Sequence, residues 1–307
     1  MGYSARYHAF SIIAIFTALA IGIVIGAGFG QDLVSDASED LEQSLSSDLD
    51  EESARSEELA AELERERAFG LRLYPPLVDS RLQGETIGVI ALGDLPESLA
   101  REIEETIEPT GGELSKVAVV REPPDVEALG GTLGPQFEDL SGGAAEERLG
   151  RLLGEDLVEG GRLVGRSRDL LLDRFSGQRG PVDNVILVKA PPEGATEEDA
   201  AAAESFEEAI VEGIRGTDVP AVYVESSTTK PSNVPFFDSL AISTVDSLDL
   251  TAGKVSAVFA LLGGEGNYGI KETADRALPD LVFPAQDQGR PADGQGLAEG
   301  SGGGRSN

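Results

Sequence analysis

The sequence predicts an α/β protein in which an N-terminal single transmembrane helix and a helical, coiled-coil-like stalk precede a mostly parallel sheet with flanking helices. Three features support this prediction. Residues 9–29 carry no charge, and residues 31–74 are acidic and contain no proline. The part that follows alternates short β-branched runs with stretches of helical periodicity, which is typical of a parallel sheet covered by helices.

The uncharged N-terminal segment is predicted to be a membrane anchor that is not removed. A hydrocarbon core about 30 Å thick needs about 20 apolar residues in a helix, whereas the apolar region of a secretory signal is about 7 to 15 residues long. Cleavage near Gly26 and Gly28 is the alternative, although no clear A-x-A pattern occurs. Arg6 precedes the segment and acidic residues follow it, so we expect a cytoplasmic N-terminus. Residues 1–30 would form the cytoplasmic stub and the anchor.

One face of this anchor carries small residues at every fourth position. Gly22 and Gly26 make a GxxxG pair, which allows two helices to approach closely. We expect this face to pack against another helix, and the alternative is that small residues are simply common in membrane helices. His8 is interpreted as a solvated flanking residue rather than a metal ligand. The residues of the face are Ala14, Ala18, Gly22 and Gly26.

Residues 31–74 are expected to form an acidic helical stalk. Leu41, Leu45 and Leu49 lie on one stripe, although Ser53 and Ser56 interrupt a strict heptad. We predict that the stalk self-associates once the membrane helices hold copies together. The alternative is a solvated, partly frayed helix whose like charges repel. The stretch from Asp32 to Phe69, about 38 residues of this stalk, would extend about 57 Å if wholly helical.

Residues 75–284 are predicted to form an extracytoplasmic α/β domain, which begins where Pro75 and Pro76 end the stalk helix. Five runs in this domain are β-branched and almost continuously apolar, as in strands buried on both faces. Three sets of apolar residues have helical spacing. The predicted strands are 86–92, 116–120, 184–189, 221–225 and 240–245, and the helical sets are Leu99, Ile103 and Ile107, then Leu149, Leu152, Leu153 and Leu157, then Val255, Val258, Phe259 and Leu262.

The remaining segments of the chain have weaker patterns. Residues 121–143 are rich in proline and glycine and are expected to form a long loop. Residues 144–176 are expected to form two helices, broken near Gly160 and Gly161, as a small subdomain. From residue 285 to 307 the chain has almost nothing to bury, so we expect a disordered tail.

Composition excludes several classes of function. A formal net charge of −32 would repel a nucleic-acid backbone, so we expect no nucleic-acid partner. The sequence has no cysteine, which excludes disulfides and thiolate metal sites. His8 is its only histidine and lies outside the predicted α/β domain, so a Ser-His-Asp relay cannot form there. Because no nucleophile, base and orienting group can be assembled, we do not expect an enzyme.

The segment GGEGNYG contains the spacing G-x-G-x-x-G at Gly264, Gly266 and Gly269. A dinucleotide fingerprint needs a strand before it and a helix after it. Here the glycines follow a predicted helix, so we interpret the segment as a helix stop and turn and expect no dinucleotide.

Polar residues lie at or just after the ends of four of the predicted strands. They are Asp94, Lys189, Glu225, Asp246 and Asp249. In an open parallel sheet, ligands gather at the carboxyl ends of the strands, and carboxylate oxygens there would suit a hard cation or a polar ligand. The four carboxylates are therefore candidate metal ligands, with no catalytic and no cofactor-binding residues assigned. The alternative is that they cap the helices that follow.

Several segments together resemble the actinobacterial copper transporter family called MctB. They are YHAFSIIAIFTALAIGIVIGAG at the start, the acidic helical stretch after it, ETIGVIALGD, and VDSLDLTAGKVSAVFALLGGEGNYGIK leading to RALPDL. The resemblance covers most of residues 1–284. It implies an envelope component with a role in copper transport or homeostasis and a location in the outer membrane or envelope. Copper is implied by the resemblance alone.

Two hypotheses of function follow. In the first, oligomers anchored through the Gly22 and Gly26 face move or buffer a metal across the envelope. In the second, the chain is a membrane-tethered scaffold whose α/β domain binds an envelope partner or a polar ligand without handling copper directly. Membrane lipid, a second copy of the chain and an envelope protein are the expected partners.

Overall fold

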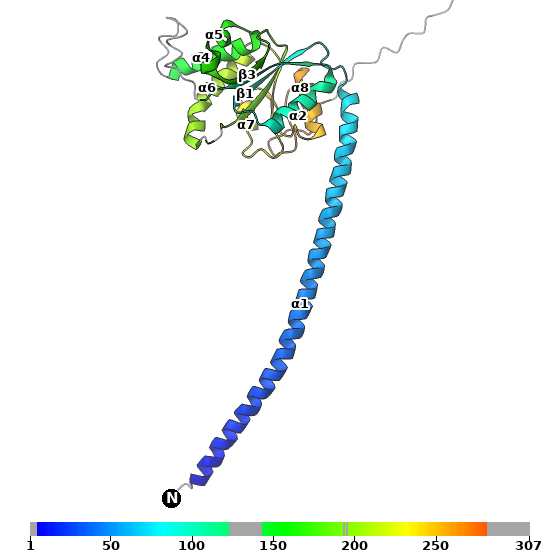
Figure 1. Cartoon of the computed structure of the whole chain (residues 1–307), viewed down its shortest axis with the longest axis vertical. Helices are drawn as coiled ribbons and strands as arrows, with labels where there is room; N and C mark the ends of the chain where they lie inside the picture. Colours follow the sequence, from blue (N-terminus) through cyan, green and yellow to red (C-terminus); the bar gives the residue numbers. More distant parts are fainter. Residues whose placement is uncertain (1–4, 123–142, 193, 195, 281–307) are drawn as a thin grey trace, which may run out of the picture. The chain divides into compact units, whose positions relative to one another are not determined.

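The computed structural model describes residues 5–122, 143–192, 194 and 196–280 (Figure 1). The chain divides into two units, Met1–Phe69 and Gly70–Asn307, and each is described by itself. Helix α1 (Ala5–Val78) is one continuous helix of 74 residues. It makes up the described part of the first unit and supplies the first helical residues of the second.

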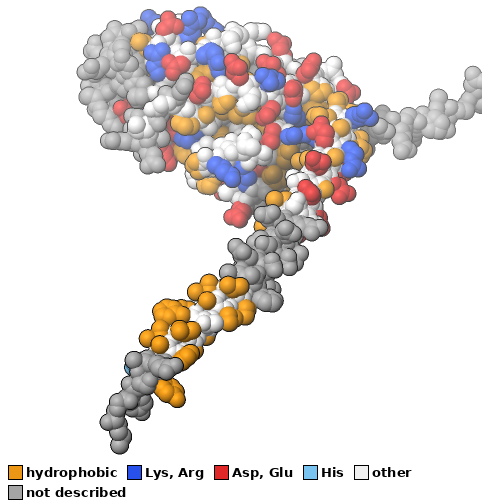
Figure 2. All heavy atoms as spheres, turned by 60° about the horizontal axis from the view of Figure 1, so that its bottom comes forward, with side chains coloured by type: hydrophobic (Ala, Val, Ile, Leu, Met, Phe, Trp, Pro, Cys, Tyr) orange, Lys and Arg blue, Asp and Glu red, His pale blue; other side chains and the backbone are white. Residues whose placement is uncertain are grey.

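The first unit contains a helix segment suited to a membrane. Among the described residues, Tyr7–Gly26 is the one segment long and apolar enough to span a bilayer, which confirms the predicted N-terminal apolar helix. Figure 2 shows its side chains as an orange band between two grey segments. None of this segment is buried within the structure. Exposed apolar surface of that extent is unfavourable in water, so lipid is the solvent that suits it.

The second unit is built on a seven-stranded sheet in the order β3-β2-β1-β4-β5-β6-β7. All neighbouring strands pair in parallel except β3, which runs antiparallel to β2 at one edge. The elements are β1 (Thr86–Gly93), α2 (Glu97–Ile107), the 3-10 helix η1 (Glu108–Thr110), β2 (Glu113–Val120), α4 (Gly143–Glu159), α5 (Arg162–Leu171), β3 (Leu172–Gly177), β4 (Asn184–Ala190), α6 (Glu197–Arg215), β5 (Ala221–Val224), α7 (Val234–Ser239), β6 (Ser243–Val245), α8 (Thr251–Leu261) and β7 (Asn267–Tyr268).

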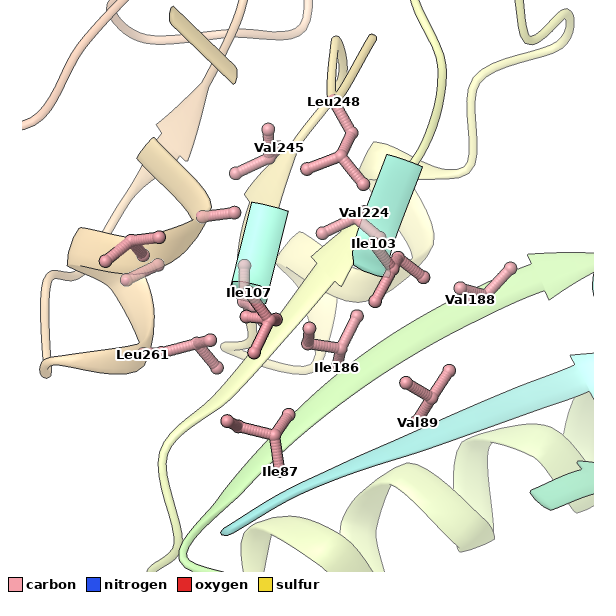
Figure 3. Packing of buried hydrophobic residues seen from close by; sticks show 14 of the residues in the cluster. Ile87, Val89, Ile103, Ile107, Ile186, Val188, Val224, Val245, Leu248 and Leu261 are labelled. Atoms are coloured by element: carbon pink, nitrogen blue, oxygen red, sulfur yellow. The ribbon is translucent and has the colours of Figure 1, made fainter. Parts of the chain in front are cut away.

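Helices cover both faces of the sheet because the central strands are apolar on both faces. Along β1, Val89 packs towards α2 and α8, while Ile90 packs towards α4, α5 and α6. Figure 3 shows Ile103 and Ile107 of α2 packed with Ile186 and Val224 of the strands. Burying each such side chain contributes about 1.5 to 3 kcal/mol. The mixed α/β class predicted from the sequence is therefore confirmed.

The five predicted strands are all present, and two further strands were not foreseen. The last predicted strand begins at Ser243 rather than Leu240. The expectation of helix up to residue 176 was wrong, because α5 ends at Leu171 and β3 follows directly. Residues of β3 are mostly exposed, but the strand supplies the hydrogen-bond partners that the outer edge of β2 would otherwise lack.

Pro75 and Pro76 do not end the first helix, contrary to expectation. The helix continues through them to Val78. Proline removes an amide donor, but Tyr74 and Val78 on either side are buried in the core, at 3 % and 0 % exposure. The hydroxyl of Tyr74 also donates to the carbonyl oxygen of Thr106. These contacts hold the last turn in helical form despite the missing donors.

The remaining sequence expectations concern the end of α8, the loop 121–143 and the tail 285–307. Leu262 was expected on the buried face of its helix, yet it follows α8 and is exposed. Gly263 has a positive φ of 93° just after it, which agrees with a helix stop there. Most of the predicted loop 121–143 and the whole of the tail 285–307 lie outside the described residues.

Candidate functional site

The order of the strands indicates the edge of the sheet at which a ligand would bind. The chain passes from β1 to β2 on one side and later to β4 on the other, so the strand order reverses between β1 and β4. Ligands of open α/β sheets bind outside the carboxyl ends of the strands at such a point. Gly93 ends β1 with φ of 84°. A Cβ atom there would lie 2.2 Å from the carbonyl oxygen of Ala190, so glycine permits the close approach of the two strand ends.

Glu225 lies at the end of β5 and is almost completely buried, at 2 % exposure. Its carboxylate accepts hydrogen bonds from the hydroxyls of Tyr223 and Ser232 at 2.7 and 2.6 Å. The backbone amide of Asn233 and the ammonium group of Lys271 donate to it at 3.0 and 2.6 Å. Burial, reinforced by the charge of Glu225, raises the pKa of Tyr223 well above its ordinary value. Tyr223 therefore remains a hydroxyl donor.

Lys271 connects Glu225 to the loop that follows β5. Its ammonium group also donates to the carbonyl oxygens of Ser226 and Thr229, both at 3.0 Å. Each of its three protons therefore has an acceptor. The buried ion pair acts as a clamp that holds residues 226–233 against the strand ends.

Asp246 follows β6 and is fully buried. It accepts the backbone amides of Ile270 and Lys271, each at 2.9 Å. Gly269 makes this possible, because a Cβ atom at Gly269 would lie 1.7 Å from a carboxylate oxygen of Asp246. Gly269 has φ of 147°, a conformation that favours glycine. The last glycine of GGEGNYG thus leaves room for the carboxylate of Asp246.

The other two candidate carboxylates differ from each other. Asp249 accepts the amide and the hydroxyl of Ser227 at 2.6 and 2.7 Å. Burial opposes ionisation of Asp249, but the bonds from Ser227 outweigh it and lower the pKa of Asp249. Asp94 is exposed, and its backbone amide donates to Ala190 at 2.8 Å. The structure therefore links Glu225 and Asp246 through Lys271 and ties Asp249 to the same loop, whereas Asp94 faces solvent.

Lys189 belongs to a second cluster, formed with Glu207 of α6 and Glu122 after β2. Lys189 forms an ion pair with Glu207 and lies 4.4 Å from the centre of the Phe236 ring. Glu122 is hydrogen-bonded to Glu207. Burial, followed by the charge of Glu207, raises the pKa of Glu122 to about 8. The two carboxyl groups therefore share a proton at neutral pH. One oxygen of Glu122 is buried without a hydrogen-bond partner.

Sequence reasoning identified Lys189 but missed Glu122 and Glu207. Glu122 lies at the start of the proline- and glycine-rich segment, and Glu207 lies within a helix rich in glutamate. In so acidic a chain each resembles a solvated surface residue. A usable signal was the spacing of Phe206, Ile210 and Ile214, which marks the buried face of α6 beside Glu207.

A buried lysine lies on β2. Lys116 donates to the carbonyl oxygens of Leu157 and Gly180 at 2.8 and 2.5 Å, and burial lowers its pKa, partly offset by Asp156. Asp156 in turn accepts the amides of Leu163 and Val164 at the start of α5. These groups are occupied in joining β2, α4 and α5.

The polar groups of this unit do not match the ligands that copper(I) prefers. Copper(I) favours thiolate and thioether sulfur, and imidazole also binds it. The sequence has no cysteine, and Met1 and His8 are its only methionine and histidine, both in the first unit. Among the residues that the structure describes, no three His, Cys, Asp or Glu side chains lie close enough to hold a metal ion.

Comparison with known families shows a match to the family described as "Copper transport outer membrane protein, MctB". The match extends over residues 3–279 and so includes both units. A comparison with curated proteins found no similar chain.

Proposed function

This chain belongs to the family of MctB copper transport outer membrane proteins, and from that membership we propose how it takes part in copper transport. The family implies a role in copper transport or resistance in the cell envelope. The N-terminal apolar helix indicates anchoring in a membrane. The proposal concerns the orientation of the chain, its own contact with copper and its partners.

In the proposed orientation, the N-terminus is cytoplasmic and the α/β unit lies on the other side of the membrane. Arg6 is the charged residue before the span, and basic residues favour the cytoplasmic side. No lysine or arginine occurs between the span and Arg55, and this lack of basic residues supports the same orientation. The α/β unit would then meet copper outside the cytoplasm.

We propose that the α/β unit acts on copper through a partner or an oligomer rather than by ligating copper(I) itself. Its sequence offers no sulfur or imidazole ligand. The buried carboxylates of Glu225 and Asp246 and the partly buried Asp249 accept hydrogen bonds from the protein. One helix cannot enclose a path for an ion, so transport would need several copies or another envelope protein. In this role the unit needs no catalytic group, in keeping with a transport family.

A scaffold with no part in copper handling is the second candidate. Among the described residues, no cluster of carboxylates could hold a metal ion, which favours the scaffold. In that case the helix of the first unit serves as a spacer, and the α/β unit binds an envelope protein.

Deletion of the gene separates the two candidates. We expect the deletion strain to lose copper tolerance or to change its copper content, and the full chain supplied from a plasmid to restore both. Unaltered tolerance and content would contradict the copper role and leave the scaffold. In parallel, purified full-length protein in detergent is titrated separately with copper(I) and copper(II). Weak or no binding of copper(I) is expected, and tight stoichiometric binding would contradict action through a partner.

A further inference from the structure

The exposed leucines of α1 suggest a specific partner. Leu45, Leu49, Leu59 and Leu63 are between 53 % and 67 % exposed, although the surrounding residues are mostly charged or small. We propose that this segment of α1 pairs with the same segment of a second copy as a parallel, in-register coiled coil. The proposal deepens the partner named under the proposed function and rests on the membrane anchor proposed there.

The spacing of these leucines fits a coiled coil. Leu45 and Leu49 are followed 14 residues later by Leu59 and Leu63. Fourteen residues are two heptads, so both leucine pairs fall on the same d and a positions. Glu52 and Ser56 occupy the d and a positions between them. The seam therefore alternates a leucine pair with a polar pair.

Charges beside the seam favour two parallel chains. With Leu49 at an a position, Glu62 falls at g and Arg67 at the following e. In a parallel pair these two positions meet across the interface, so each helix would form a Glu62 to Arg67 contact with its partner. Most of the other acidic residues fall at the outer b and c positions, where repulsion across the seam is small; they are Asp50, Glu51, Glu57, Glu58 and Glu64.

The polar layer explains why this pairing depends on the anchor. In register, the two Glu52 side chains face each other, and like charges in a seam oppose association. One leucine pair in every 14 residues buries little surface on its own. Anchors in one membrane hold the copies in the same orientation and raise their effective concentration, so that weak contacts suffice. We therefore infer a reversible dimer contact rather than a permanent one.

The absence of cysteine from the sequence makes disulfide cross-linking in membranes a direct test. Leu49→Cys and Leu63→Cys, each alone in the full chain, are expected to form covalent dimers on mild oxidation. Ala54→Cys and Ala61→Cys fall at the outer f positions and are the matched controls, with at least tenfold less cross-linking expected. An antiparallel pair would not join Leu49→Cys to itself. Equal cross-linking at all four positions, or none at Leu49 and Leu63, would overturn the proposal.

A variant that should increase association distinguishes a weakened dimer contact from disturbed folding, because disturbed folding would not increase cross-linking. Glu52→Leu replaces the like charges of the polar layer by an apolar pair, so the cross-linked fraction of Leu63→Cys should at least double. No increase would count against the proposed register. Cross-linking does not depend on copper. The stalk contact can therefore be absent while deletion of the gene still changes copper tolerance, and the stalk contact can be present while copper tolerance is unaltered.

Discussion

At the scale of single residues, the buried ion pair of Glu225 and Lys271 is the feature whose loss should matter most. The two side chains are only 2 % and 16 % exposed. Such a pair is weak evidence for stability as a whole, but removing one partner leaves the other charge buried and uncompensated. The loop 226–233 also depends on it.

We predict that Glu225→Gln lowers the free energy of unfolding of the full chain by about 3 kcal/mol. Glutamine keeps the volume and some hydrogen bonds but not the charge that Lys271 requires. Denaturant unfolding of the protein in detergent, followed by circular dichroism, measures the change. Glu272→Gln, at an exposed neighbouring position, is the control and should stay within about 0.5 kcal/mol of the parent. Equal midpoints for the two variants would refute the clamp.

The carboxyl pair of Glu122 and Glu207 makes stability depend on pH. Burial raises the pKa of Glu122 from 4.5 to about 8, and it raises the pKa of Glu207 as well. The folded chain therefore holds a proton that the unfolded chain releases above about pH 4.5. Stability from this site is fully present at low pH and declines as the pH rises towards about 8. Lys189, Asp173 and Glu204 act on the same pair, so the titration belongs to the cluster.

For Glu122→Gln we predict a flatter stability curve between pH 5 and pH 8. The amide cannot ionise, so the variant should gain stability relative to the parent as the pH rises. Unfolding midpoints at pH 5, 6.5 and 8 provide the measurement, with Asp94→Asn at an exposed position as the control. A parent and a variant whose stabilities change in parallel across this range would show that the Glu122 and Glu207 pair does not hold a proton.

The residues of these clusters were only partly predictable from the sequence. Glu225 and Asp246 could be singled out because each follows a recognisable strand. The apolar spacing of α6 marks the helix face beside Glu207. It does not show that Glu207 meets Glu122, because that contact depends on how α6 packs beside the strand ends. Asp246 also shows that position alone does not reveal a role. Its two amide partners come from the segment after GGEGNYG, which no local pattern connects to it.

At the scale of elements, α4 and α6 pack closely because glycines at their contact allow the two backbones to approach each other. A Cβ atom at Gly154 would lie 2.2 Å from the carbonyl oxygen of Ile210, and one at Gly213 would lie 2.1 Å from that of Arg151. Backbone atoms cannot move aside as a flexible side chain can. The two helices would have to separate and lose part of their buried contact.

Gly154→Ala is therefore predicted to destabilise the chain by about 1 to 3 kcal/mol, as overpacking typically does. Gly165→Ala in α5 is the matched control, because a Cβ atom there has no neighbour within 4 Å. Alanine at that helical site should stabilise by about 0.5 to 1 kcal/mol. Thermal unfolding of the two variants compares them. A neutral Gly154→Ala would mean that the helices are not in such close contact.

Some elements could be predicted from their own residues, and others could not. Strands such as 184–189 were predictable because burial on both faces requires an unbroken apolar run. β3 was not, since the edge strand LDRFSG is largely exposed and carries little apolar signal. β7 has only two residues. The passage of the helix through Pro75 was unpredictable because Tyr74 and Val78 gain their stability from distant parts of the fold.

At the scale of the whole molecule, the distribution of residue types fits a tethered protein of the envelope. Apolar residues are exposed on Tyr7–Gly26 and buried in the α/β unit. The α/β unit carries no cysteine, methionine or histidine side chain for copper(I). The part that this chain plays in copper transport therefore depends on where the α/β unit is held and on which molecules it meets there.

Labelling of single cysteines in intact cells tests that central point most directly. Gly165→Cys lies at an exposed position of the α/β unit, and Ser4→Cys precedes the proposed span. With a membrane-impermeant maleimide, we predict that Gly165→Cys reacts in intact cells and that Ser4→Cys reacts only after lysis, with both proteins recovered in the membrane fraction. Protection of Gly165→Cys in intact cells, or recovery of a soluble chain lacking its first residues, would contradict the account.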